Sequence, residues 1–108
     1  MLLEVCAYTC RPGTIKKQLA LYERMGKGPQ TRHLGQPFAY LVTEVGNLNQ
    51  YVHIWRYDDA ADREKRRSAM KADPEWQAYV MESDELGALE NQQNQLMTPV
   101  SFFPLDKR

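Results

Sequence analysis

The sequence predicts an α+β domain built on a four-stranded antiparallel sheet. Short segments in which apolar and polar residues alternate indicate strands, and two longer segments with apolar residues three and four apart indicate helices. A Gly-Asn pair separates the second and third strand segments, which favours an antiparallel hairpin. The 108 residues suit one domain spanning residues 1–108.

The first strand is expected over residues 3–10, where successive side chains would point to opposite faces of the sheet. One face would carry Leu3, Val5 and Ala7, and the other Glu4, Cys6 and Tyr8. Arg11-Pro12-Gly13 ends this strand, and Thr14 is a suitable N-cap for a helix. The helix has an apolar stripe made of Ile15, Leu19, Tyr22 and Met25. Gly26, Gly28 and Pro29 are expected to end or kink it, before a short helical turn that stops at Gly35.

Residues 38–44 and 48–57 are the second and third strands, with Gly46-Asn47 between them. Asp58 is expected to cap the next helix, and Asp73-Pro74-Glu75 is a second helix start, with proline at the first helical position. The charged run 62–67 contains the i,i+4 pair Asp62 and Arg66, which favours a solvated helix face. Residues 90–100 are the last strand, although the polar run 90–95 is also compatible with helix.

The resulting order, strand–helix–strand–strand–helix–strand, is the ferredoxin-like βαββαβ arrangement, in which both helical segments cover one face of the sheet.

The composition excludes several classes of protein. Fourteen basic residues balance fourteen acidic ones, so no strong positive charge points to nucleic acid. No apolar run reaches the roughly 20 residues of a membrane span, and the N-terminal residues do not resemble a signal peptide, so a cytoplasmic location is expected. Cys6 and Cys10 would lie about 13 Å apart in a strand, too far for a disulfide.

Several motifs resemble those of the NIPSNAP family. They are the Asn-Gln-x-x-His-x-Trp-x-Tyr pattern at 49–57, Asp-Arg-Glu at 62–64, Asp-Pro-Glu-Trp at 73–76 and the stretch from Pro99 to Pro104, together with Tyr8-Thr9 and Pro12-Gly13-Thr14. The resemblance covers nearly the whole chain. It implies a dimeric α/β barrel, in which the ferredoxin-like sheets of two subunits face each other, and hence a homodimer. It does not imply one particular reaction.

The third strand carries the candidate site. If Val52 and Ile54 contact the helices, Tyr51, His53 and Trp55 lie on the opposite face. An aromatic stripe of this kind indicates an interface or ligand site. The candidate ligand-binding residues, expected to line a space between facing sheets, are Glu4, Tyr8, Asn49, Tyr51, His53 and Trp55.

Two functions remain open. One is a non-catalytic module whose polar-aromatic cavity binds a small, partly apolar molecule. The other is a cofactor-independent oxygenase or isomerase that uses His53 as general base, oriented by a nearby carboxylate. A hydrogen-bonded interior histidine is the simpler interpretation of His53. No glycine-rich phosphate loop is present, and His33 and His53 lack metal-ligand spacing, so no cofactor or metal is expected.

Overall fold

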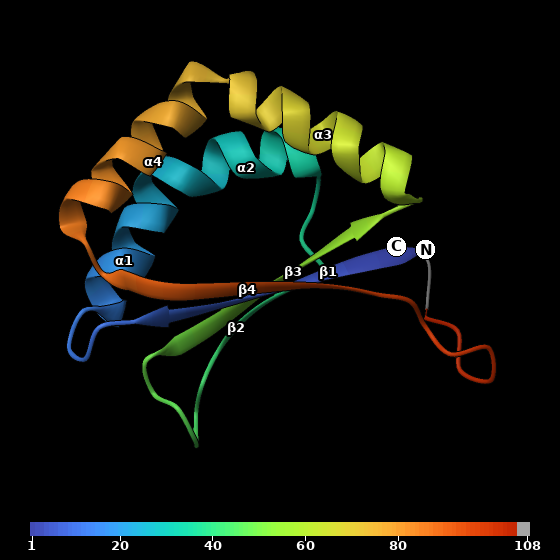
Figure 1. Cartoon of the computed structure of the whole chain (residues 1–108), viewed down its shortest axis with the longest axis horizontal. Coiled ribbons are helices and arrows are strands. Elements are labelled where there is room, and N and C mark those ends of the chain that lie inside the picture. The colour runs from blue at the N-terminus through green and yellow to red at the C-terminus, as the bar shows by residue number, and fades with distance from the viewer. Residues whose placement is uncertain (106–108) are drawn as a thin grey trace.

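The computed structural model describes residues 1–105, in which all helices cover one face of a four-stranded sheet (Figure 1). The strands are β1 (Leu2–Cys10), β2 (Ala39–Val42), β3 (Gln50–Tyr57) and β4 (Leu89–Met97). Their spatial order is β2-β3-β1-β4, and each neighbouring pair is antiparallel. This topology confirms the predicted ferredoxin-like α+β fold.

The helical layer consists of α1 (Ile15–Leu21), a π-helical turn η1 (Tyr22–Gly26), α2 (Lys27–Leu34), α3 (Ala60–Ala72) and α4 (Pro74–Leu86). The first three follow one another without a break. Gly26, Gly28 and Pro29, which were predicted to end or kink the first helix, therefore do not end it. The chain absorbs them by widening to a π turn, a feature frequent at functional sites. Gly35, with φ of +86°, does end α2, as expected.

The helix starts follow simple capping chemistry. The carboxylate of Asp73 accepts a hydrogen bond from the Glu75 amide, and Pro74 occupies the start of α4, as predicted. The cap of α3 is Asp59, which accepts from the Asp62 amide, and not Asp58 as predicted. The Asp58 amide instead donates to the Asp62 carboxylate. Because Asp58 and Asp59 are adjacent, either was a reasonable N-cap candidate from the sequence.

The prediction of which sheet face meets the helices was wrong, and the two faces are exchanged. Tyr51, His53, Trp55 and Tyr57 of β3 point toward the helices and are buried, whereas Val52 and Ile54 lie on the open face. In β1 the helix-facing residues are Glu4, Cys6, Tyr8 and Cys10. Direct pairing of Val5 with Ile54, and of Ala7 with Val52, gathers the aliphatic side chains on the face without helices. The larger aromatic and polar side chains form the core.

That core has two buried clusters. Cys6, Leu34, Trp55, Tyr57 and Met70 form one, and Leu21, Tyr22 and Tyr79 form the other. Trp76 of α4 packs against both. Because the second cluster joins η1 to α4, the geometry of the π turn and the placement of α4 depend on each other.

The polar run 90–95 belongs to β4, which settles the ambiguity between helix and strand. β4 pairs with β1 at the edge of the sheet, where polar side chains remain solvated and discourage edge-to-edge association. The strand ends at Met97 and not at residue 100, and beyond it Phe102 and Phe103 are exposed. No helix within residues 1–105 is both long and apolar enough to cross a membrane.

Gly26 and Gly28 allow the effect of close packing on stability to be distinguished from the effect of helix propensity. A Cβ added to Gly26 would lie 2.9 Å from the Tyr22 ring and 3.0 Å from the Tyr79 ring, whereas one added to Gly28 would meet nothing within 4 Å. We expect Gly26→Ala to lower the free energy of unfolding by about 1–3 kcal/mol through overpacking. Gly28→Ala should raise it by about 0.5–1 kcal/mol. Urea denaturation measures both, and equal effects of the two substitutions would contradict the assigned role of Gly26.

Candidate functional site: a cavity between sheet and helices

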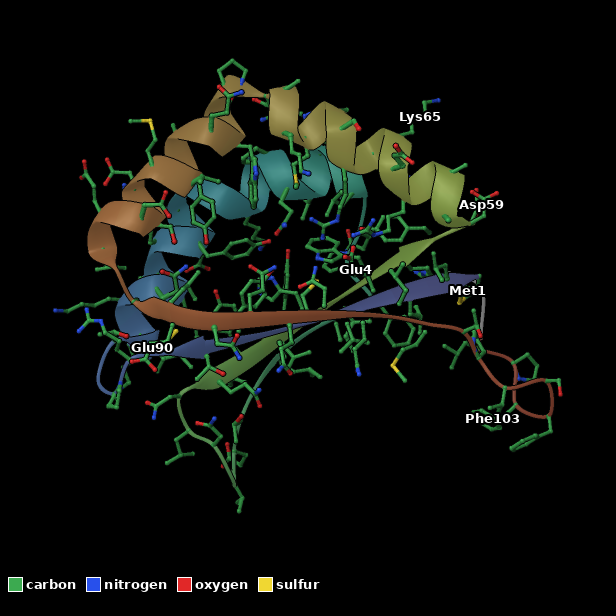
Figure 2. The ribbon with its side chains drawn as sticks, in the orientation of Figure 1. Met1, Glu4, Asp59, Lys65, Glu90 and Phe103 are labelled. Atoms are coloured by element: carbon green, nitrogen blue, oxygen red, sulfur yellow. The ribbon has the colours of Figure 1, made fainter. Side chains whose placement is uncertain are left out.

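A cavity of about 200 Å³ lies between the middle of the sheet and the helical layer. Figure 2 shows side chains from both layers projecting into the space between them. The sheet contributes Tyr8, Tyr51, His53, Leu89 and Gln92, and the helices contribute Tyr22, Gln30, Arg67, Trp76, Tyr79, Val80, Ser83 and Asp84. An aromatic wall with a few polar groups is the usual composition of a small-molecule site.

The aromatic walls are held in place by ring contacts and hydrogen bonds. Tyr8 and Tyr51 stack, with centroids 4.7 Å apart and ring planes inclined by 15°. The hydroxyl of Tyr22, in the π turn, donates to Oε1 of Gln30 at 2.7 Å and lies 2.8 Å from the hydroxyl of Tyr40. Burial raises the pKa of the cavity tyrosines Tyr8, Tyr22 and Tyr51, so their hydroxyls are neutral at pH 7.

A second set of hydrogen bonds orders the end of the cavity near α1. The amide nitrogen of Gln18, which is fully buried, donates to the Tyr79 hydroxyl at 3.0 Å and approaches Ser83 Oγ at 3.4 Å and the Tyr51 hydroxyl at 3.5 Å. One side chain of α1 thereby connects β3 to α4. The polar groups at this end already have partners within the protein.

His53 differs from these groups. It lies at the centre of β3 with 3% of its surface exposed and is surrounded by Tyr8, Tyr22, Tyr40 and Tyr51 at centroid distances of 4.6–5.3 Å. Its Nδ1 is buried without a hydrogen-bond partner in the described part of the chain. Burial lowers the pKa of His53 to about 4, so the imidazole is neutral at pH 7.

Glu4 is fully buried and is the centre of a network of four donors. Arg63 Nη2 donates to Oε2 at 2.8 Å, and Asn94 Nδ2 to the same oxygen at 2.9 Å. Arg67 Nε and the Tyr57 hydroxyl each donate to Oε1 at 2.9 Å. Burial alone would raise the pKa of Glu4, but the hydrogen bond from Arg63, the charge of Arg67 and the bonds from Asn94 and Tyr57 lower it to about 2.

Arg67 connects this network to the cavity. Its guanidinium pairs with Glu4 on one side and is part of the cavity wall on the other. The run 62–67 is therefore only partly a solvated helix face. Arg66 does pair with Asp62 across one turn at 2.9 Å, as expected, but Arg63 and Arg67 turn inward. Arg63 and Arg67 are four residues apart and so share one helix face, which was the only indication in the sequence. This spacing indicates an inward orientation only when a buried carboxylate is known to face it.

The structure brings together three of the six residues chosen from sequence, because Tyr8, Tyr51 and His53 line the cavity. Trp55 packs behind His53, with centroids 6.2 Å apart, and Glu4 reaches the cavity only through Arg67. Asn49 precedes β3, and its carbonyl oxygen accepts from the Cys10 amide, away from the cavity. The face of His53 is opposite to the predicted one, and neither Glu4, Tyr8 nor Asn49 bonds to it within residues 1–105.

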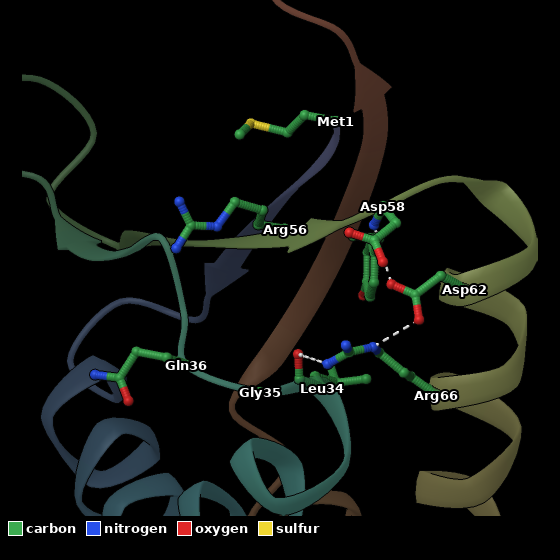
Figure 3. Close-up of a pocket in the computed structure, with 9 residues that line it drawn as sticks. Met1, Leu34, Gly35, Gln36, Arg56, Asp58, Asp62 and Arg66 are labelled. Atoms are coloured by element: carbon green, nitrogen blue, oxygen red, sulfur yellow. Dashed lines mark hydrogen bonds and ion pairs between the residues drawn. The ribbon is translucent and has the colours of Figure 1, made fainter. Parts of the chain in front are cut away.

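A larger hollow of about 510 Å³ lies at the other end of β3, lined by Arg56, Asp58, Asp62, Arg66 and residues near Leu34 (Figure 3). Arg66 is occupied there by Asp62 and by the Leu34 carbonyl oxygen at 3.2 Å. Arg56 lies over the Phe38 ring, 5.5 Å from its centroid. Because two aspartates offset the two arginines in this hollow, the aromatic-lined cavity beside His53 is the better candidate site.

No group of three or more His, Cys, Asp or Glu side chains among residues 1–105 is arranged to hold a metal ion. Cys6 and Cys10 are both buried and free. Burial raises the pKa of the Cys6 thiol to about 11, so this sulfur is protonated at pH 7 and is a poor nucleophile.

Comparison with known proteins gives the family. The NIPSNAP family model matches residues 3–104. The chain belongs to the NIPSNAP family. A NIPSNAP family protein of unknown function from Agrobacterium tumefaciens has a crystal structure that is 34% identical, with a TM-score of 0.88 over 98% of this chain and 94% of that one. A NIPSNAP-like domain protein from Burkholderia xenovorans is 38% identical, with a TM-score of 0.87 over 96% and 89%.

Among curated proteins, human NipSnap homolog 3A is 27% identical over 96% of this chain. The chain spans 41% of the length of that relative, and 18% of a NipSnap protein from Caenorhabditis elegans. An antibiotic biosynthesis monooxygenase shares the fold at 21% identity and a TM-score of 0.63, over 93% of this chain and 99% of that one. These comparisons confirm the resemblance seen in the sequence and assign no ligand to the cavity.

The Glu4 network predicts a specific acid sensitivity. The pKa of Glu4 falls from 4.5 to about 2 on folding, so its contribution is complete above pH 4.5 and is lost as the pH drops toward 2. Because Arg63 is about a third exposed, screening reduces this contribution to an expected ~1–3 kcal/mol.

We expect Glu4→Gln, which leaves two inward-facing guanidinium groups without a carboxylate, to lower the free energy of unfolding by ~3–5 kcal/mol at pH 7. It should also flatten the pH dependence between 4.5 and 2. Chemical denaturation across pH measures both effects, and Asp62→Asn, at the partly exposed Asp62–Arg66 pair of α3, is the control. A Glu4→Gln protein as stable as the wild type would contradict the structural role of the network.

Proposed function

We propose that this protein binds a small, partly apolar molecule in the cavity between sheet and helices. The observation that carries the proposal is His53, whose buried Nδ1 has no partner within residues 1–105 although it lies at the wall of a 200 Å³ space. Buried polar atoms in folded proteins nearly always have hydrogen-bond partners. A bound molecule that contacts this nitrogen would supply one.

The aromatic lining of the cavity supports a flat ligand. Tyr8, Tyr22 and Tyr51 surround His53, and Trp76 and Tyr79 are also part of the wall. Aromatic rings gain most from contact with another ring, stacked or edge-on. The volume is below the roughly 300–1,000 Å³ typical of sites for drug-sized compounds, which favours a ligand of about one ring.

A cofactor-independent oxygenase or isomerase with His53 as general base is the second candidate. The neutral imidazole favours it, since only the neutral form can accept a proton. Against it, no carboxylate bonds to the ring among residues 1–105, and a pKa of about 4 makes His53 a weak base. Binding without turnover is therefore the better supported function. A loss of roughly two orders of magnitude in turnover of a bound compound by His53→Gln would reverse this preference.

His53 should be a residue that the unliganded fold does not need. We expect His53→Leu to leave the free energy of unfolding at pH 7 unchanged or higher, because it replaces an unpartnered polar group by an apolar one. The wild type should lose up to about 3 kcal/mol as the pH falls from 6.5 to 4, since there the unfolded state binds a proton that buried His53 does not. The variant should lack this slope in urea titrations.

The same substitution tests the function. Native mass spectrometry of the gently purified protein and calorimetric titration with benzyl alcohol, cinnamyl alcohol and cinnamate should detect a bound ring compound. His53→Leu should weaken binding by about 3- to 10-fold, the effect of one lost hydrogen bond. His33→Leu, at a histidine that contacts Asp73 outside the cavity, is the matched control and should bind normally. If no carried molecule and no saturable binding is found, the proposed function is wrong.

We also propose a homodimer formed through the open faces of two sheets. Leu3, Val5, Ala7, Val52 and Ile54 lie on this face without a covering helix, and Leu41 and Met97 extend it with about half of their surfaces exposed. A contiguous apolar face of this kind usually marks an interface. Phe102 and Phe103, 86% and 69% exposed, would add to it.

Sedimentation should show a dimer at micromolar concentration. Ile54→Lys should shift the equilibrium to a folded monomer, because the charge would be buried only between subunits. Removal of residues 101–108 should weaken the dimer. Lys65→Glu, on the exposed side of α3, should leave it intact. A wild-type protein that is monomeric at these concentrations would exclude this assembly.

A further inference from the structure

The charges around the cavity are unequal, and this imbalance carries information about the ligand. Arg63 and Arg67 face inward toward a single carboxylate, that of Glu4. Each oxygen of Glu4 already accepts two hydrogen bonds. The cluster therefore has an excess of one positive charge, next to the cavity.

Arg67 is the residue of this cluster that brings positive charge to the cavity wall. Its Nε is committed to Glu4, while Nη2 lies 4.0 Å from the Cys6 sulfur, a weak acceptor. Within residues 1–105, neither terminal nitrogen of Arg67 pairs with a carboxylate. The side chain is 15% exposed, and it is part of the cavity wall, so these donors are accessible from inside.

The other groups on the wall do not supply a compensating charge. Burial keeps the Tyr8, Tyr22 and Tyr51 hydroxyls protonated, raises the pKa of Tyr79 to about 12 and keeps His53 neutral. Asp84 is the one acidic residue of the lining, and it is exposed on α4, where water solvates its carboxylate. Cys6, on the far side of Arg67, is held as a neutral thiol by its burial.

We propose that the ligand is a small aromatic or conjugated carboxylic acid whose carboxylate binds the free edge of the Arg67 guanidinium while its ring lies among the tyrosines around His53. This inference rests on the proposed function and deepens it. The planar guanidinium matches a carboxylate with two parallel hydrogen bonds, which is stronger and more directional than a contact to a hydroxyl.

The volume of 200 Å³ limits the ligand to about one ring. Its ring replaces water against Tyr8 and Tyr51, beside His53. Glu4 acts as the positioning residue: it holds Arg67 from behind through Nε, so that the opposite edge of the guanidinium is directed to the ligand.

The test compares an acid with a neutral molecule of the same shape. Calorimetric titration of the wild-type protein should show that trans-cinnamate binds about 10- to 100-fold more tightly than cinnamyl alcohol, the effect of a charge-assisted hydrogen bond. Benzoate and benzyl alcohol form a second pair. A shift of the Trp76 indole N–H resonance on titration places the probes in the cavity, since Trp76 is part of its lining.

Arg67→Lys keeps a positive charge beside Glu4 but removes the planar fork, and should reduce the preference for the acid to less than about 3-fold without changing the affinity for the alcohol. Arg66→Lys, the adjacent arginine that pairs with Asp62, is the matched control and should retain the full preference. If circular dichroism shows that Arg67→Lys folds poorly, the double variant Glu4→Gln/Arg67→Gln takes its place. It removes both charges of the Glu4–Arg67 pair, and its affinities for the acid and the alcohol are compared in the same way.

The outcomes separate the two proposals. Equal affinity of the wild type for acid and alcohol, with binding that His53→Leu weakens, overturns the carboxylate inference and leaves the proposed function standing. An acid preference that survives both Arg67 variants also overturns the inference. If neither member of either pair binds, both proposals fail.

Discussion

The buried Glu4 carboxylate constrains the arrangement of this fold more than any other single group. It accepts hydrogen bonds from Tyr57 on β3, from Arg63 and Arg67 on α3 and from Asn94 on β4, so it ties together four elements that are distant in sequence. A carboxylate removed from water is tolerated only with such compensation. Once Glu4 must meet two arginines of α3, the face of β1 that carries it has to point toward the helices.

The orientation of the rest of the sheet follows from that choice. Since β1 and β3 are paired in register, placing Glu4 inside also places Trp55, His53 and Tyr51 inside, and the aliphatic residues outside. The outcome is a core rich in tyrosine and hydrogen bonds beside a sheet face with Val, Ile, Leu and Ala at its centre. A face of that composition is well suited to pack against a second sheet, whereas the polar-aromatic interior retains a space for a ligand.

Features that do not maximise stability gather around that space. Within residues 1–105, His53 Nδ1 has no hydrogen-bond partner and the terminal nitrogens of Arg67 pair with no carboxylate, and the π turn widens the helix where Tyr22 enters the wall. Buried groups without partners persist where function needs them and neighbouring interactions offset their cost. Gly26 allows the π turn to pack closely on Tyr79, so the shape of the cavity and the stability of the second core cluster are linked.

The sequence by itself determined the order of elements, the hairpin at Gly46, the Asp73 cap and the residues that share each strand face, because these depend on local chemistry and on a period of two. It also brought Tyr8, Tyr51 and His53 to one face. Only the tertiary structure decided which face that is. Aliphatic residues normally meet helices, and the contrary result depends on the pairing of Glu4 with Arg63 and Arg67, which lie about 60 positions away along the chain. The helical half of the cavity, with Tyr22, Tyr79 and Arg67, was likewise decided by long-range contacts that no local pattern encodes.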